Sequence, residues 1–299
     1  MSVTSKSPSA VLRVALEIAR RALPAYSHRC SPKKFTQHQL FACLVLRNFL
    51  KTDYRGVVAQ LQESPQLAEV IGLEQIPHYT TLQKASKKLL ASQRAKRLLD
   101  VTVRAQLQRK QRVETALVDS TGLACTVAST YFVKRRVRQD LPWKSLVYHR
   151  YAKLAVVADA ASHFILAFYT RRGPKPDVAE FQPMLKDALT RVRVSCIVAD
   201  AGYDSEANHV LAREQHRVRT VIPAKHGRPT TKPAKGRHRR LMQTRFDSDK
   251  YRQRAQVETV MSMIKRRQGA AVRGATYHSQ CRELRLMALT HNVMILLFY

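Results

Sequence analysis

The chain has 299 residues, 45% of them hydrophobic, and its 53 Lys and Arg against 21 Asp and Glu give a formal charge of +32. This composition allows a buried core in one or two domains, and the excess of cations indicates a polyanionic partner, nucleic acid in preference to a membrane surface. We expect a cytoplasmic protein with reduced thiols, because no apolar run reaches the roughly 18 residues of a spanning helix, no secretory signal is seen and the five cysteines form no Cys-x-x-Cys pair.

The first third of the chain is predicted to be all-helical. Apolar residues recur at helical spacing through 8–23 and 37–100, with little strand signal. A helix is expected to open after Pro77, and it carries Lys84, Lys87 and Lys88. A proline-bounded turn before a basic helix is compatible with a helix-turn-helix that reads DNA, but short helix pairs also occur in any helical domain. We expect residues 1–108 to form a DNA-binding or dimerisation domain.

From residue 115 onward the pattern changes to short β-rich runs alternating with helices, which is typical of an α/β chain. We expect a second domain over residues 109–299. Its predicted strands are Thr115–Val118, Leu154–Ala158, Phe164–Thr170, Ser195–Ala199 and Arg219–Pro223, and its predicted helices include Phe181–Val192 and Ser205–Gln215.

Two basic stretches interrupt this second part. Residues 133–153 include Arg135 and Arg136 together with Trp143, the only tryptophan, and residues 224–249 are predicted to form a flexible basic loop. A charge run is usually a solvated loop, but two like-signed runs flanking acidic residues suit contacts with phosphates. Trp143 either stacks on a base or anchors the core.

Three carboxylates stand out in a chain that is poor in acids. Asp119 and Asp200 each follow an apolar strand and precede a turn of small residues, and Glu258 lies on a predicted helix. Burying an acid at a strand end costs several kcal/mol unless it is paired or metal-bound. Oxygen ligands without His or Cys select Mg²⁺ or Mn²⁺, and two ions about 4 Å apart can hold both reacting oxygens of a phosphoryl displacement.

The helix expected around Glu258 has two faces. Tyr251, Arg254, Glu258 and Lys265 fall within about 60° of one another at helical spacing. The separate apolar stripe consists of Val257, Val260, Met261 and Ile264. Cations one or two turns from a metal-binding carboxylate suit the handling of a phosphodiester, whereas the alternative is a solvated face with i,i+4 charge pairs.

Several other polar residues are expected to be structural. Asp159 lies in a hairpin connection, and Asp177 precedes a helix that it is predicted to cap. Asp204 and Glu206 are expected to cap the helix that begins near Ser205. The histidines His149, His163 and His291 are not paired with a Ser or Cys in a nucleophile arrangement.

Taken in order, these features resemble the RNase H-like catalytic core of DDE transposases. The Tyr-x2-Arg-x3-Glu-x6-Lys spacing matches a motif of the bacterial insertion-sequence branch. Val118–Leu123 and Ala199–Ser205 are similar to its two Asp segments, and Lys153-Leu154 also fits. The resemblance covers roughly residues 110–298 and is weaker over the helical N-terminal part.

The resemblance implies an α/β fold, an RNase H-like core with a mixed five-stranded sheet flanked by helices, preceded by the all-helical domain. It implies a DNA transposase that cuts the ends of its mobile element and transfers the 3′ hydroxyl into target DNA. Asp119, Asp200 and Glu258 would bind two Mg²⁺ ions, which Mn²⁺ could replace, while Arg254 and Lys265 contact phosphates and Tyr251 packs or hydrogen-bonds nearby. The expected partners are double-stranded DNA and a second copy of the chain, in the nucleoid of a bacterium.

Two other functions remain compatible with the same residues. A plain RNase H-like nuclease or junction resolvase needs the carboxylates, but it leaves the Tyr/Arg/Lys residues and the helical N-terminal part without a role. A catalytically decayed copy would act only as a DNA-binding repressor, although its three acids are intact.

Overall fold

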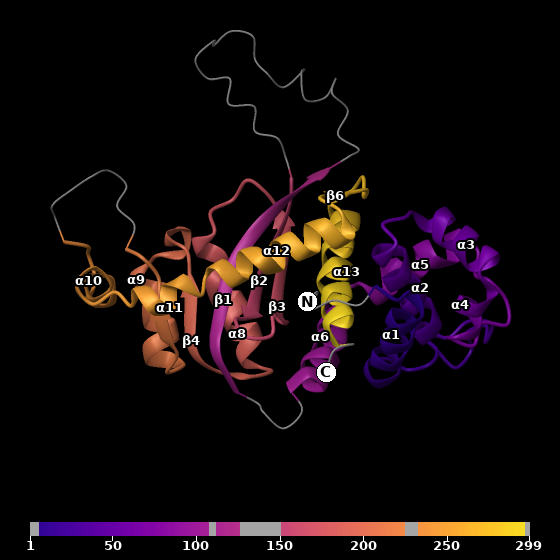
Figure 1. Ribbon diagram of the computed structural model, residues 1–299, viewed down its shortest axis with the longest axis horizontal. Coiled ribbons are helices and arrows are strands. Elements are labelled where there is room, and N and C mark those ends of the chain that lie inside the picture. Colours follow the sequence, from indigo (N-terminus) through magenta and orange to yellow (C-terminus); the bar gives the residue numbers. More distant parts are fainter. Residues whose placement is uncertain (1–5, 108–111, 126–150, 225–232, 297–299) are drawn as a thin grey trace, which may run out of the picture.

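The computed structural model describes residues 6–107, 112–125, 151–224 and 233–296. Within these ranges, helices come first and a mixed sheet with flanking helices comes second, as the sequence predicts (Figure 1).

The N-terminal part is helical throughout. Its helices are α1 (Pro8–Ala22), α2 (Gln37–Phe49), α3 (Tyr54–Glu63), α4 (Pro65–Glu69), α5 (Tyr79–Leu89) and α6 (Ser92–Leu107). Polar side chains start several of them, because the first amides of a helix lack partners within it. Ser7 caps α1, Thr36 forms a capping box with Gln39 on α2, and Asp53 caps α3.

The sheet has the strand order β3-β2-β1-β4-β5. The strands are β1 (Arg112–Cys125), β2 (Ala152–Asp159), β3 (Ile165–Arg172), β4 (Arg193–Ala199), β5 (Arg219–Val221) and β6 (Ala271–Val272). β2 pairs antiparallel with both β1 and β3, whereas β4 is parallel to β1 and to β5. The mixed five-stranded sheet is confirmed. The sequence missed β6, whose two residues pair with the end of β1.

The first strand is longer than predicted. We expected it to end at Val118, but β1 continues to Cys125 and stays paired with β2 as far as Leu123. Asp119 is therefore an interior residue of β1. Only the pairing with β4 ends at Val118.

Helices cover the sheet, with α12 (Ala255–Gln268) in front of it and α8 (Val178–Leu189) behind it in the view of Figure 1. The predicted apolar stripe of α12 is buried, including Val257 and Ile264. α9 (Glu206–Val210) follows β4 and continues as a π-helical turn, Leu211–Gln215.

The predicted flexible basic loop is wrong over much of its length. Residues 225–232 lie outside the described ranges, but two short helices, α10 (Arg237–Thr244) and α11 (Ser248–Arg252), occupy most of the chain between residues 233 and 252. Helical backbone bonds and long-range contacts order these basic residues in the folded chain.

The last helix, α13 (Tyr277–Ile295), joins the two parts of the molecule. It contacts β2 and β3 and also α1, α2, α5 and α6, and Figure 1 shows it standing between the sheet and the N-terminal helices. The buried hydrophobic residues form one continuous cluster across both parts. The boundary near residue 108 remains a prediction.

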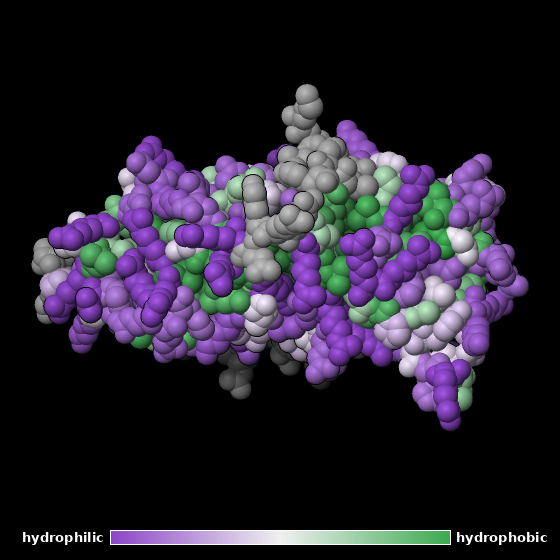
Figure 2. All heavy atoms as spheres, turned by 90° about the horizontal axis from the view of Figure 1, so that it is seen from below, coloured by the Kyte–Doolittle hydropathy of each residue, from purple (hydrophilic) through white to green (hydrophobic). Residues whose placement is uncertain are grey.

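The surface agrees with the basic composition. Figure 2 shows one face on which hydrophilic side chains predominate over both parts, with smaller apolar areas between them. None of the helices that the structure describes has the length and apolar character needed to span a bilayer.

Candidate active site

Asp119 and Asp200 lie side by side because their strands are parallel neighbours. Val118 of β1 pairs with Ala199 of β4, and each aspartate is the next residue along its chain. The Asp200 carboxylate accepts a hydrogen bond from the amide of Gly202, which turns the chain away from the sheet. The fold thus brings two acids from distant segments to one position.

Glu258 reaches the same region from α12. It lines a hollow of about 420 Å³ together with Asp119 and Lys265. The Glu258 side chain is half exposed and forms an ion pair with Arg254, with 2.6 Å between Arg254 Nη2 and Glu258 Oε1. The structure therefore brings Asp119, Glu258 and Lys265 around one open hollow, with Asp200 beside Asp119.

The protein environment disfavours the charged form of the Asp119 carboxyl group. Its pKa is raised to about 6, chiefly by burial, and the nearby charges of Asp200 and Asp177 also contribute to this rise. The Ser120 amide, which donates to Asp119 Oδ1 over 2.8 Å, and the Arg254 guanidinium act in the opposite direction. A cation placed against this carboxylate would stabilise its charged form.

The donor chemistry of these acids fits a divalent metal ion. Asp119, Asp200 and Glu258 offer only oxygen atoms, which Mg²⁺ and Mn²⁺ prefer. Within the described ranges no three His, Cys, Asp or Glu side chains are gathered closely enough to hold an ion. Glu258 binds Arg254 instead. A metal held by all three acids would require Glu258 to exchange this arginine for the ion.

The expected continuous helical stripe is interrupted. Tyr251 lies in α11, whereas Glu258 and Lys265 lie in α12, and Arg254 stands at the junction as the N-cap residue of α12. The junction is a tighter turn, in which the Arg254 amide donates to the carbonyl of Tyr251, three residues back, over 2.8 Å. The Tyr251 ring packs against Phe246. Of the three residues expected beside Glu258, Lys265 therefore lies on α12, Arg254 lies at its N-cap and Tyr251 lies on α11.

A network on the other side of β1 was not predicted from the sequence. Ser120 Oγ donates to Asp177 Oδ1 over 2.7 Å, and Lys153 Nζ lies 2.6 Å from the same oxygen. Lys153 also pairs with the fully buried Glu180 at 3.0 Å, and Arg171 pairs with that acid at 3.2 Å. The signal that could have revealed it was a lysine within the otherwise apolar strand β2 and a glutamate on the buried face of α8.

The prediction that Asp177 caps α8 is wrong. Asp177 occupies the N-cap position, but its side chain makes no capping hydrogen bond and binds Ser120 and Lys153 instead. Its charge contributes to the raised pKa of Asp119. Asp177 is therefore a fourth acid near the candidate site.

The predicted capping roles of Asp204 and Glu206 are also wrong, since Ser205 caps α9. Asp204 is buried and binds Arg239 of α10, with 2.7 Å between Asp204 Oδ2 and Arg239 Nη2. Glu206 accepts hydrogen bonds from the amides of His238 and Arg239, and so it caps α10. Both acids fix α10 against α9.

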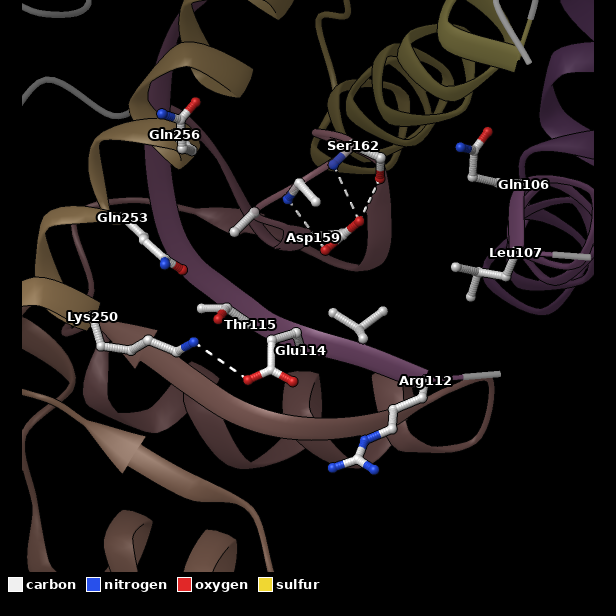
Figure 3. A pocket seen from close by; sticks show the side chains of 13 residues that line it. Gln106, Leu107, Arg112, Glu114, Thr115, Asp159, Ser162, Lys250, Gln253 and Gln256 are labelled. Atoms are coloured by element: carbon white, nitrogen blue, oxygen red, sulfur yellow. Dashed lines mark hydrogen bonds and ion pairs between the residues drawn. The ribbon is translucent and has the colours of Figure 1, made fainter. Parts of the chain in front are cut away.

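The structural role of Asp159 is confirmed, because it accepts hydrogen bonds from the amides of Ala161 and Ser162 in the β2–β3 hairpin. Asp159 also lines a hollow of about 720 Å³ near the start of β1, where Lys250 pairs with Glu114 (Figure 3). Asp119, Asp200 and Glu258 do not line this hollow.

The other predicted DNA contacts remain predictions. Lys84, Lys87 and Lys88 are exposed on α5, which leaves them accessible to a ligand. Arg135, Arg136 and Trp143 lie outside the described residues, as does His149. His163 and His291 bind each other, through the His291 ring and the His163 carbonyl, at 2.9 Å.

Comparison with known proteins gives one result. A family model described as "Transposase DDE domain" matches residues 112–293, more than half of the chain and the span that holds all three candidate acids. No curated protein matches the chain.

Proposed function

The chain belongs to the family defined by the transposase DDE domain, and we propose that it cuts DNA at the ends of its own mobile element and joins the freed 3′ hydroxyl to target DNA. We assign it an RNase H-like core and the bacterial insertion-sequence branch of the family. The observation that carries this proposal is the convergence of Asp119 and Asp200 on adjacent strands with Glu258 across one hollow.

Asp119, Asp200 and Glu258 would hold Mg²⁺, or Mn²⁺ in its place. The bound metal would supply Lewis-acid activation of the attacking oxygen and stabilisation of the leaving one. Arg254 forms an ion pair with Glu258. The guanidinium of Arg254, which lies beside Glu258, would bind a phosphate of the DNA end.

The remaining side chains of the hollow are suited to position the substrate. Lys265 lines it without an ion-pair partner among the described residues, so its ammonium group is available to a phosphate. Arg254 and Lys265 hold the scissile strand against the acids in this proposal, while Tyr251 supports Arg254 from α11. Double-stranded DNA is the substrate, and pairing of two element ends requires at least a dimer.

Substitution of each proposed ligand tests the assignment. Asp119→Asn, Asp200→Asn and Glu258→Gln should each abolish cleavage in Mg²⁺, because loss of a direct ligand should exceed the ~10–100-fold effect of an outer-shell change. The measurement is cleavage and strand joining of labelled DNA that carries the repeats flanking the gene. Asp159→Asn is the matched control, since that acid holds a hairpin.

Two results would redirect the proposal. Near wild-type cleavage by any one of the three variants would remove that residue from the site. A wild-type protein that nicks DNA but never joins a pre-cleaved end would favour a nuclease over a transposase.

A further inference from the structure

A third hollow lies at the contact between the N-terminal helices and the matched domain, that is, residues 112–293, which match the family model. Its volume is about 490 Å³, and its lining comes from α2, α3, α5, the segment after β6 and the start of α13. Figure 1 shows α2 and α5 beside α13 at this contact. Four of the lining residues are cations: Arg47, Lys87, Arg273 and Arg282.

Arg47 is the most informative of these residues. It is only 5% exposed, and its Nε atom has no hydrogen-bond partner. Its guanidinium lies 4.4 Å from the centroid of the Tyr54 ring, which compensates only part of the cost of burying a charge. No acid of the described chain forms an ion pair with it. A buried arginine that lines a hollow and lacks an acidic partner is suited to bind an anion.

The acids of the hollow do not neutralise its cations. The lining includes Asp53 and Glu283, so four cations face two acids. Asp53 Oδ1 accepts from the Gly56 amide at 2.7 Å, and Glu283 Oε2 accepts from the Arg273 amide at 2.7 Å. Both acids are thus engaged with backbone amides, and the hollow keeps a positive charge.

The hollow is also connected to the candidate active site. Asn48, the neighbour of Arg47, donates a hydrogen bond to Gln268 at the end of α12, the helix that carries Glu258 and Lys265. β6 follows α12 and pairs with the end of β1, the strand that carries Asp119. A ligand in this hollow would contact α2 and the segment after β6, which are joined to the elements that carry the acids.

We propose that this hollow binds a backbone phosphate of the DNA substrate and holds it across the two parts of the protein. Arg47 and Lys87 contribute from the N-terminal helices, and Arg273 and Arg282 from the matched domain. Neither part forms the site alone. The inference rests on the proposed function in one respect, namely that DNA is the substrate.

The test measures binding without catalysis. Fluorescence anisotropy of a labelled random-sequence duplex, titrated over a range of salt, gives the slope of log affinity against log salt. Each phosphate contact contributes roughly 0.9 to that slope for duplex DNA. Arg282→Gln should therefore lower the magnitude of the slope by about 1 and weaken binding uniformly across sequences. Lys87→Gln and Arg47→Gln should act in the same direction.

Arg13→Gln is the matched control, because Arg13 is exposed on α1 and lies outside the hollow. Arg47 is buried, so Arg47→Gln is interpreted only if its circular dichroism matches the wild type. If it does not match, the variants of the exposed Lys87 and the partly buried Arg282 still test the proposal.

The outcomes are distinct. Slopes for Arg282→Gln and Lys87→Gln that equal that of Arg13→Gln would overturn the phosphate site while DNA binding stands. A wild-type protein that does not bind duplex DNA would overturn the proposed function as well.

Discussion

Lys153 of β2 and Glu180 of α8 form a buried ion pair between the sheet and the helix behind it. Both side chains are almost fully buried, at 4% and 0% exposure, and their charged atoms are 3.0 Å apart. A buried ion pair adds little net stability, but removal of one partner leaves an unpaired charge. Because Lys153 also binds Asp177, which in turn binds Ser120 next to Asp119, this pair bears on the geometry of the candidate site.

We predict that Lys153→Met lowers the free energy of unfolding by about 3–5 kcal/mol. The added change Glu180→Gln should recover part of that loss, since it removes the charge left behind. Urea unfolding of the two single variants and the double variant measures the coupling. Lys96→Met is the control, because the Lys96–Asp187 pair is partly exposed and should contribute less than about 1 kcal/mol. Equal losses at Lys96 and Lys153 would contradict the prediction.

We predict that the free energy of unfolding depends on pH through the buried His291 ring. Burial lowers the pKa of its ring from 6.5 to about 4, although the hydrogen bond to the His163 carbonyl opposes that change. A depressed pKa means that the stabilisation is present above pH 6.5 and is lost as the pH falls, because the unfolded chain takes up the proton first. The wild type should lose roughly 3 kcal/mol through this group by about pH 4.

His291→Gln keeps a hydrogen-bond donor but cannot take up a proton. As the pH falls from 6.5 to 4, the free energy of unfolding should therefore decrease more in the wild type than in this variant. Urea titrations across this range measure it. His278→Gln, an exposed change on the same helix, should show no such trend, and a trend of equal size there would rule out His291 as its source.

At the level of elements, α10 depends on residues far from it in the sequence. Its first amides are capped by Glu206, and its Arg239 is paired with the buried Asp204. We predict that Glu206→Ala lowers the free energy of unfolding by about 1 kcal/mol, within the usual range for a lost N-cap. Hydrogen exchange of the amides of 238–242 should become faster, whereas Glu69→Ala, at an exposed site on α4, should leave it unchanged. Unaltered exchange in Glu206→Ala would show that the cap does not hold α10.

Elements with their own periodic pattern were predictable, and elements that depend on distant partners were not. The apolar stripe of α12 was identified from its spacing and is buried. By contrast, Asp119–Gly122 has the composition of a turn, yet it remains in β1 because β2 pairs with it residue by residue. The segment of α10 looked like a basic loop because the acids that fix it lie about 30 residues earlier.

The candidate site shows the same division. Asp119, Asp200 and Glu258 were found from short motifs, and their metal-binding role remains a prediction. Asp177 was misassigned because an Asp before a helix has the same local sequence whether its side chain caps that helix or turns toward Ser120 and Lys153. Local pattern cannot separate these two orientations.

For the whole molecule, Asn292 of α13 is the central polar contact. Its side-chain oxygen accepts from the Ile165 amide at 2.9 Å, and its nitrogen donates to the Ile165 carbonyl at 2.8 Å. The same nitrogen lies 3.2 Å from Thr102 Oγ1 on α6. One buried amide thus links the edge strand β3 to the N-terminal helices.

Asn292→Leu should therefore be strongly destabilising. The substitution preserves the side-chain volume but leaves the amide and the carbonyl of Ile165 without a partner. Each unpaired group should lower the free energy of unfolding by about 1–3 kcal/mol. Urea unfolding should show this loss. Thr290→Val on the same helix is the matched control, because the buried Thr290 hydroxyl has no hydrogen-bond partner and its removal should be neutral or stabilising. A loss in Thr290→Val as large as in Asn292→Leu would mean that packing, and not the amide, matters here.

The position of α13 also limits how such proteins can be recombined. Nearly all of this helix lies within the residues that match the family, yet it packs against α1, α2, α5 and α6. A hybrid gene that joined the N-terminal helices of one relative to the remainder of another would set a foreign surface against this helix. A graft that exchanged residues 6–107 together with Tyr277–Ile295 would keep the contacts of α13 with the N-terminal helices, but it would set a foreign helix against β2 and β3. Because α13 contacts both the N-terminal helices and the sheet, neither part can be exchanged between relatives without changing one of its two contact surfaces.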